Sequence, residues 1–188
     1  MIDIAVDQAD LKRLAAASQA TGKNIDRELS AAINATAQPT RKVMAREIVQ
    51  KVNLKVGVVN KKLKKGIRSN PKTLKTSVKL KHQQRLGLQY FGASQTKKGV
   101  AYKIDKSGGR KMVVGAFMGP KPRVKAPKLN GGAFIRSGKT RLPIKKLHGV
   151  SPWAVFLKRS LDTPTEKQSS QRLSKEVNKR IGKALRGF

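Results

Sequence analysis

The sequence predicts an α+β fold built from amino-terminal helices, an antiparallel β-sheet and a carboxy-terminal helix. Residues 24–51 carry apolar side chains at a period near 3.6, which is typical of an amphipathic helix. Residues 71–117 change to a period of two, with turn residues between short runs, which favours consecutive antiparallel strands. Residues 162–188 return to helical spacing after a clear start signal.

The composition limits the class of protein. The chain has 188 residues, enough for one domain with a core, and contains no cysteine, which excludes disulfides and thiolate metal sites. The amino terminus lacks the basic start and apolar run of a signal peptide. No stretch contains the roughly 20 apolar residues needed to span a bilayer. We therefore expect no membrane partner.

Positive charge is concentrated in the middle of the chain. The 43 lysines and arginines exceed the ten acidic residues by 33. Residues 51–159 hold 29 of these bases and one acid, Asp105, a balance of 29 − 1 = +28. Charges of one sign at this density repel one another, and a nearby polyanion offsets that cost. We therefore expect contact with nucleic acid or another strongly acidic surface.

At the amino terminus, Ile2, Ile4 and Val6 alternate with polar residues and predict a short strand. Asp7 is placed to cap a helix that ends near Gly22. The spacing of Asp3, Asp7 and Asp10 raises a metal site as an alternative. We favour capping and contact with a basic neighbour, and expect no bound metal.

The second helix, at residues 24–51, contains Pro39, which removes one backbone donor and predicts a kink. Downstream, Val59, Leu63 and Ile67 recur every four residues among the lysines of residues 58–68, which predicts a short basic helix that ends around Gly66. This basic face is either simply solvated or in contact with phosphates.

The alternating region predicts short strands joined by turns and a lysine- and proline-rich loop at 119–130. The predicted strands cover residues 74–80, 86–93, 100–104, 112–118, 131–135 and 141–144. The last helix should start with Thr163 as N-cap, Pro164 at the first position and Glu166 completing a capping box. We expect one compact domain with three regions, at 1–52, 53–161 and 162–188.

No catalytic constellation is present in the sequence. A two-metal site needs several converging carboxylates, and the basic region has only Asp105. His82 and His148 belong to no zinc or nucleophile motif, and Gly108-Gly109 is better explained as a turn than as a phosphate loop. We therefore expect a protein that is not an enzyme and that binds no cofactor.

Electrostatic contact without base readout is the activity that the sequence favours. The residues expected to face double-stranded DNA or acidic neighbours are Lys61, Lys62, Lys64, Lys65, Arg68, Arg110, Lys111, Lys121, Arg123, Lys125 and Lys128. The apolar stripes of the long and terminal helices could serve a neighbouring subunit. The residues expected there are Leu29, Ile33, Val43, Leu173, Val177 and Ile181.

Four short pieces, in their order and spacing, resemble the minor tail protein Z family of tailed phages and prophages, the tail completion proteins. The pieces are Ala31-Ala32-Ile33-Asn34, Asn70-Pro71, Gly132-Ala133-Phe134-Ile135 and Arg141-Leu142-Pro143-Ile144. The resemblance covers most of the chain. The positive charge of this chain is dispersed and comes mostly from lysine, unlike the long arginine tracts of some members of the family.

The resemblance implies a virion component at the head-proximal end of the tail, or neck, assembled in the host cytoplasm. It further implies a ring, expected to be hexameric, beside the tail terminator and the head–tail connector and close to the end of the genome. The composition alone also fits a ribosomal or chromatin-type nucleic-acid-binding protein. That rival would bind RNA or bulk DNA as a monomer or dimer, whereas a tail protein would form rings or appear in purified particles.

Overall fold

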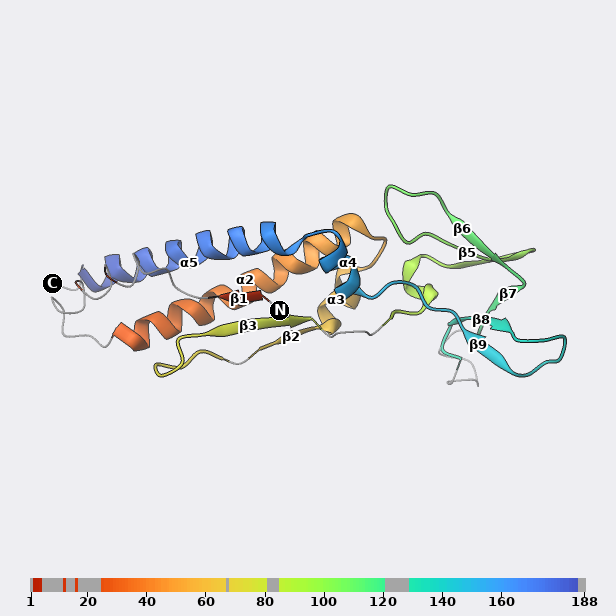
Figure 1. Cartoon of the computed structure of the whole chain (residues 1–188), viewed down its shortest axis with the longest axis horizontal. Helices are drawn as coiled ribbons and strands as arrows, with labels where there is room; N and C mark the ends of the chain where they lie inside the picture. The colour runs from red at the N-terminus through yellow and green to blue at the C-terminus, as the bar shows by residue number, and fades with distance from the viewer. Residues whose placement is uncertain are drawn as a thin grey trace. The chain divides into compact units, whose positions relative to one another are not determined.

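The computed structural model describes residues 2–4, 12, 16, 25–66, 68–80, 85–120 and 129–185. Its helices, labelled as in Figure 1, are α2 (Ile25–Lys51), α3 (Val56–Lys62), the 3-10 helix η1 (Leu88–Phe91), α4 (Pro152–Lys158) and α5 (Asp162–Leu185). The strands are β1 (Ile2–Ile4), β2 (Leu63–Lys65), β3 (Thr76–Leu80), β4 (Ser94–Thr96), β5 (Gly99–Tyr102), β6 (Lys111–Val114), β7 (Ala116–Met118), β8 (Ala133–Arg136) and β9 (Ile144–Lys146).

The described strands form three antiparallel sheets of three strands each, in the orders β1-β3-β2, β4-β5-β6 and β7-β8-β9. This confirms the predicted α+β class, with a long amino-terminal helix, antiparallel strands and a carboxy-terminal helix. The single antiparallel sheet that the sequence predicted is instead divided into three sheets. Gly115, at φ 72°, separates β6 from β7, so the predicted strand 112–118 divides between two sheets.

The chain divides into two compact units. Unit 1 contains Met1–Ala45, Leu63–Leu80 and Ser160–Phe188, and unit 2 contains Arg46–Lys62 and Lys81–Arg159. The predicted amino-terminal and carboxy-terminal regions therefore contribute to the same unit, and the basic middle of the chain supplies most of the other.

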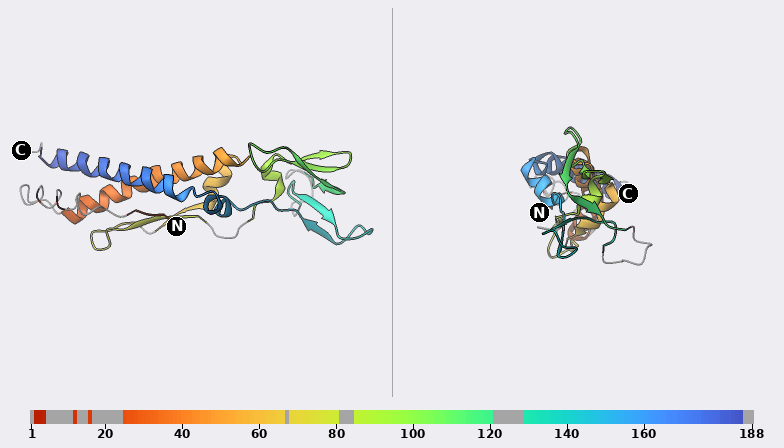
Figure 2. Two further views of the ribbon diagram at one scale, coloured as in Figure 1. Left: turned by 45° about the horizontal axis from the view of Figure 1, so that its top comes forward. Right: turned by 90° about the vertical axis from the view of Figure 1, so that its right-hand side faces the viewer.

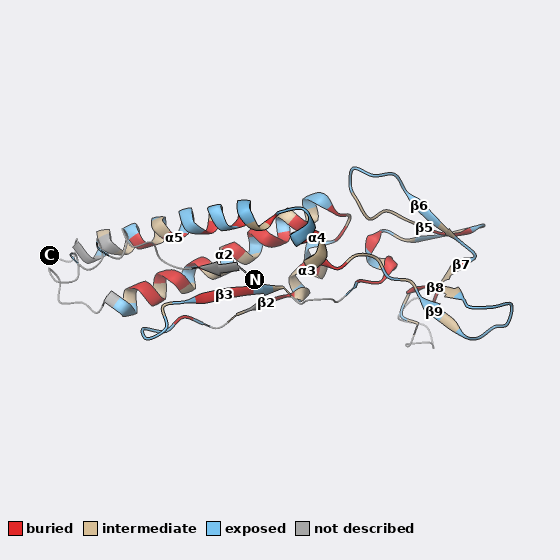
Figure 3. Cartoon of the chain, viewed as in Figure 1, coloured by how far each residue is buried: buried red, intermediate tan, exposed pale blue. Residues whose placement is uncertain are grey.

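In unit 1, α2 and α5 pack antiparallel to each other (Figure 1). Arg180 Nη1 lies 2.9 Å from Glu28 Oε2, and Ser169 Oγ lies 3.0 Å from Thr40 Oγ1. A cluster of buried apolar side chains joins the two helices. Its members are Leu29, Ala32, Ile33, Leu173 and Val177. In the view of Figure 3, buried residues are visible along α2, and the visible side of α5 is mostly exposed.

Pro39 lies inside α2, which continues as one helix to Lys51. The missing N–H leaves the Ala35 carbonyl without its helical donor. Because Ala35 is exposed, water can hydrate that carbonyl at little cost. Near the proline, the buried hydroxyls of Thr36 and Thr40 donate to the carbonyls of Ala32 and Thr36, at 2.8 and 2.9 Å.

Two predicted elements are wrong. The basic helix expected to end around Gly66 ends at Lys62 instead, because Leu63–Lys65 pairs with Val78–Leu80 as strand β2. The strand expected over 86–93 is the 3-10 helix η1, preceded by the extended Gly87 and ended by Gly92 at φ 64°. A left-handed residue at this position favours glycine and stops the chain from continuing as a strand.

The carboxy-terminal part also differs in detail. The segment around Trp153 and Phe156 is helix α4, whose N-cap Ser151 Oγ accepts from Ala154 N at 3.1 Å. Strand β9 starts at Ile144, so most of the piece expected over 141–144 lies before it. Helix α5 begins at Asp162, one residue before the expected cap. The expected helix at 7–22, with the acids Asp7 and Asp10, lies outside the described residues, apart from Lys12 and Ala16, which are helical.

Unit 2 contains the sheets β4-β5-β6 and β7-β8-β9, whose strands are drawn in Figure 2. Phe117 of β7 and Phe134 of β8 stack with ring centroids 6.0 Å apart. The Arg136 guanidinium lies 5.5 Å from the centroid of the Phe117 ring, a cation–π contact. Phe91 and Val100 are fully buried, whereas Tyr90 is 42% exposed.

Candidate nucleic-acid interface

The two units differ in charge. Unit 2 has 24 lysines and arginines and two acids, a balance of 24 − 2 = +22, whereas unit 1 has 19 − 8 = +11. In the described part of unit 2, 17 of 19 basic residues are exposed. Two-thirds of the net charge therefore belongs to unit 2, and nearly all of its described cations meet solvent.

The acids of unit 2 do little to compensate this charge. Asp105 Oδ1 pairs with the Arg159 guanidinium, and the Asp105 backbone forms a bridge with Val52. The other acid, Glu47, lies on α2. In unit 1, by contrast, a single arginine, Arg180, forms ion pairs with two carboxylates, those of Glu28 at 2.9 Å and Glu176 at 3.5 Å. Unit 2 therefore keeps a large uncompensated positive field.

The predicted run from Lys61 to Arg68 does not form one helical face. Lys61 and Lys62 end α3 in unit 2, whereas Lys64 and Arg68 belong to unit 1. Lys61, Lys64 and Arg68 are exposed, and Lys62 is half-buried. The side chain of Lys65 lies outside the described residues. The three exposed cations of this run, Lys61, Lys64 and Arg68, therefore belong to different elements and different units.

The second predicted group contains one structural arginine and one exposed lysine. Arg110 Nη2 donates to the Gly92 carbonyl at 3.1 Å and to Ser94 Oγ at 2.9 Å. Arg110 therefore ties the start of β6 to the end of η1 while remaining exposed. Lys111, the first residue of β6, is exposed. The loop residues Lys121, Arg123, Lys125 and Lys128 lie outside the described residues.

Other cations were not expected from the sequence. Arg136, Lys139, Arg141, Lys145 and Lys146 are all exposed around strands β8 and β9. The sequence signal that could have identified this group is its local charge, since residues 136–146 contain five basic residues and no acid. Lysines on an edge strand such as β9 also oppose edge-to-edge pairing with another chain, so these positions have a structural explanation as well.

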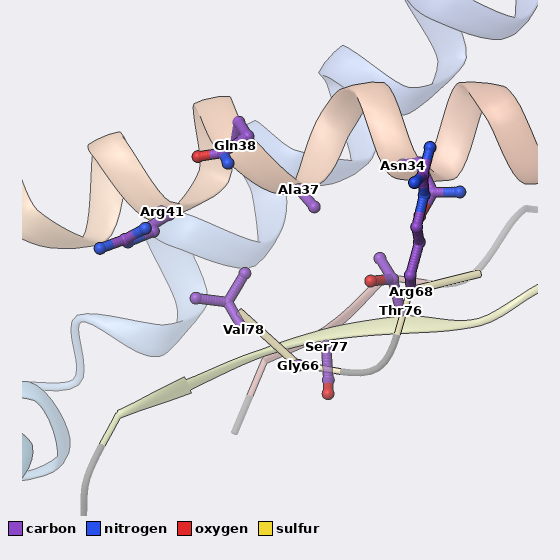
Figure 4. Close-up of a pocket in the computed structure, with 9 residues that line it drawn as sticks. All are labelled: Asn34, Ala37, Gln38, Arg41, Gly66, Arg68, Thr76, Ser77 and Val78. Atoms are coloured by element: carbon purple, nitrogen blue, oxygen red, sulfur yellow. The ribbon is translucent and has the colours of Figure 1, made fainter. Parts of the chain in front are cut away.

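A pocket of about 340 Å³ in unit 1 includes the predicted residue Arg68 (Figure 4). Asn34, Gln38 and Arg41 enter it from α2, opposite the strand residues Thr76 and Ser77. None of the described residues that line it is acidic. Two guanidinium groups beside hydroxyl and amide groups suit an anion, so Arg68 has a concave setting rather than an isolated position on the surface.

The residues expected at a subunit contact lie inside the chain. Leu29, Ile33, Leu173 and Val177 are at most 2% exposed and pack against one another between α2 and α5. Val43 is also buried, at 7% exposure, and the side chain of Ile181 lies outside the described residues. Leu29, Ile33, Val43, Leu173 and Val177 are therefore buried within one chain and do not form a surface for a neighbouring subunit in this fold.

The described residues contain no group of three or more histidine or acidic side chains placed to hold a metal ion. Within the same part of the chain, no helix is both long and apolar enough to cross a bilayer.

The relationship to known proteins comes from one comparison. No curated protein and no solved structure matches the chain. The family model described as prophage minor tail protein Z (GPZ) matches residues 3–188, almost the whole length. The charge-rich middle and both terminal helices lie within the match. The chain therefore belongs to the prophage minor tail protein Z family.

Proposed function

We propose that this chain is a non-enzymatic structural subunit of the virion at the head-proximal end of the tail. In this role it forms a homo-oligomeric ring between the tail terminator and the head–tail connector and contacts the end of the double-stranded genome without reading its sequence. The family is that of a minor tail protein, which supports a structural role in the tail. The position, the ring and the DNA contact are the proposal.

The observation that carries the DNA contact is the charge of unit 2, 24 bases against two acids, with 17 of its 19 described cations exposed. Such a surface gains affinity for duplex DNA by releasing condensed counterions from the phosphates. The exposed cations of unit 2 lie on strands, on turns and on helices, including the end of α2. Contacts of this kind position a protein on the backbone and carry no sequence information.

The ring cannot use the apolar stripes of α2 and α5, because they are buried within one chain. Its contacts therefore lie on other surfaces. Mass spectrometry of purified particles, together with negative-stain imaging of the isolated protein, tests this part. We expect the protein in mature particles and closed rings in the images. Its absence from particles, with co-sedimentation on ribosomes or nucleoid, would contradict the proposal and favour the rival class.

Charge reversal tests the genome contact. The variant Lys61→Glu/Lys64→Glu/Arg68→Glu changes three exposed cations, of which Lys61 lies at the end of α3 in unit 2, Lys64 in β2 and Arg68 in the segment after β2, both in unit 1. The control Lys167→Glu/Lys175→Glu/Lys179→Glu makes the same charge change on the exposed side of α5. We expect the first variant to lower genome retention in particles by about tenfold, since it removes about three phosphate contacts, and the control to retain its DNA. Equal retention in both would contradict the contact.

A further inference from the structure

Unit 2 contains a pocket of about 350 Å³ between the end of β5, the turn that follows it and helix α4. Residues more than 40 positions apart in the chain meet there, with Lys111 on one side and Lys158 and Arg159 on the other. This pocket combines one residue already expected to contact DNA with two that the sequence did not single out.

The charged groups of the pocket are three cations and one acid. Lys111 and Lys158 are exposed. The acid, Asp105, is engaged by the Arg159 guanidinium, and this pair fixes the end of α4 against the turn after β5. The pocket therefore has a net charge of +2 (3 − 1) and lies within the +22 field of unit 2. An anion in the pocket is therefore attracted both by the local charge of +2 and by the positive field of unit 2.

The remaining lining is apolar or small. Val150, Ala154 and the Tyr102 ring supply apolar surface. At Gly109, no atom lies within 4 Å of the position that a Cβ would occupy, so the backbone there is open to an approaching ligand atom. A phosphodiester joined to deoxyribose has this same combination, an anionic group next to apolar sugar faces.

We propose that this pocket binds one phosphodiester of the duplex backbone, with Lys111 and Lys158 contacting the phosphate oxygens. Arg159 is paired with Asp105, so the net charge of +2 comes from the two lysines. Val150 and Tyr102 pack against the adjoining sugar. This inference rests on the proposed contact with DNA and deepens it, because it assigns a defined phosphate site within a surface that otherwise attracts DNA diffusely.

A matched pair of variants separates a defined site from a diffuse field. Lys111→Gln/Lys158→Gln removes two exposed charges from the pocket, and Lys97→Gln/Lys98→Gln removes two exposed charges from the β4–β5 turn of the same unit. Binding to a fluorescent duplex of arbitrary sequence is measured over a range of salt. Thermal unfolding of each variant checks that both are folded.

We expect the pocket variant to bind about tenfold more weakly, with the slope of log K against log salt reduced by about 1, since the site neutralises one phosphate and each neutralised phosphate contributes about 0.9. The control should lose less than about twofold, as a diffuse long-range contribution. Equal losses in the two variants would overturn the inference while leaving the proposed function intact. Failure of the wild-type protein to bind any duplex would overturn the proposed function itself.

Two further probes address the chemistry of the ligand. In protein labelled with ¹⁵N-glycine, inorganic phosphate should shift the Gly108 and Gly109 amide signals saturably, and the shift should vanish in the pocket variant. Unchanged glycine signals would count against the site. Poly-glutamate is the probe for acidic protein surfaces. Loss of poly-glutamate binding with unchanged DNA binding in the pocket variant would mean that the pocket takes carboxylates, and would overturn the inference.

Discussion

The side-chain amide of Asn34 holds the backbone of Ser69 by two hydrogen bonds. Asn34 Nδ2 donates to the Ser69 carbonyl at 2.9 Å, and the Ser69 amide donates to Asn34 Oδ1 at 3.0 Å. The pair fastens α2 to the segment that leads from β2 to β3. Asn34 ends one of the short family-like pieces and Ser69 immediately precedes another, Asn70-Pro71. Two pieces that are remote in sequence therefore meet at one structural joint.

Replacing Asn34 with alanine should destabilise unit 1. Ser69 is 5% exposed, so its amide and carbonyl would lose their partners in a largely dry position. We expect a loss of about 1–3 kcal/mol in the free energy of unfolding, measured with urea. Gln38→Ala, at an exposed position on the same helix, should change it by less than about 0.5 kcal/mol. Equal values for the two variants would show that the Asn34 bonds add nothing.

Leu173→Ala should cost about 2–5 kcal/mol, because it opens a cavity between α2 and α5. The exposed neighbour Lys175→Ala should be nearly neutral. Because Leu173 packs within its own chain, the loss should be the same at every protein concentration. A loss that disappears on dilution would instead assign Leu173 to a subunit contact, as the sequence alone suggested.

The buried hydroxyls of Thr40 and Ser169 should be energetically coupled. Their oxygens lie 3.0 Å apart, and both residues are at most 3% exposed. A double-mutant cycle with Thr40→Val and Ser169→Ala should give a coupling of about 0.5–1.5 kcal/mol, the net value of a hydrogen bond. Strictly additive effects would mean that each hydroxyl is satisfied by its own helix alone, through the Thr36 and Thr165 carbonyls.

Gly99→Ala should destabilise unit 2. A Cβ at Gly99 would lie 2.0 Å from the Val113 carbonyl oxygen, so β5 and β6 would have to separate. We expect a cost of about 1–3 kcal/mol in thermal or urea unfolding, as for other overpacking substitutions. Gly109→Ala meets no atom within 4 Å and serves as the control, expected within about 0.5 kcal/mol of wild type. The reverse order would contradict the register of these strands.

The long helices could be predicted because their signals are local. The apolar period of α2 continues through Pro39, and the Asp162–Glu166 segment predicts the start of α5 to within two residues. Both signals lie within the segment that they describe, so no distant contact is needed to read them.

The wrong elements depended on distant partners. Leu63 fits a helical spacing of four with Val59, but it pairs with Leu80 in a sheet, and this pairing overrides the local preference. In the same way, Leu88 and Phe91 belong to a 3-10 turn between two glycines rather than to a strand. Periodicity over so few residues does not distinguish these outcomes.

The candidate site could be predicted only in part, because its arrangement also depends on contacts between residues that are distant in the sequence. Total charge is a property of composition, and it identified the basic part of the chain correctly. Which cations lie together is a property of the fold. Lys111 and Lys158 line one pocket only because α4 returns to the turn after β5, where Arg159 meets Asp105. No spacing in the sequence contains that information.

The most direct test of the account is DNA–protein crosslinking in intact particles, followed by mass spectrometry of the crosslinked peptides. We predict crosslinks from residues 46–62 and 81–159, the segments of unit 2, with Lys111 and Lys158 among them, and few from the exposed lysines of α5. Crosslinks confined to α5, or none to this protein in particles that contain it, would contradict the claim that its basic unit contacts the genome.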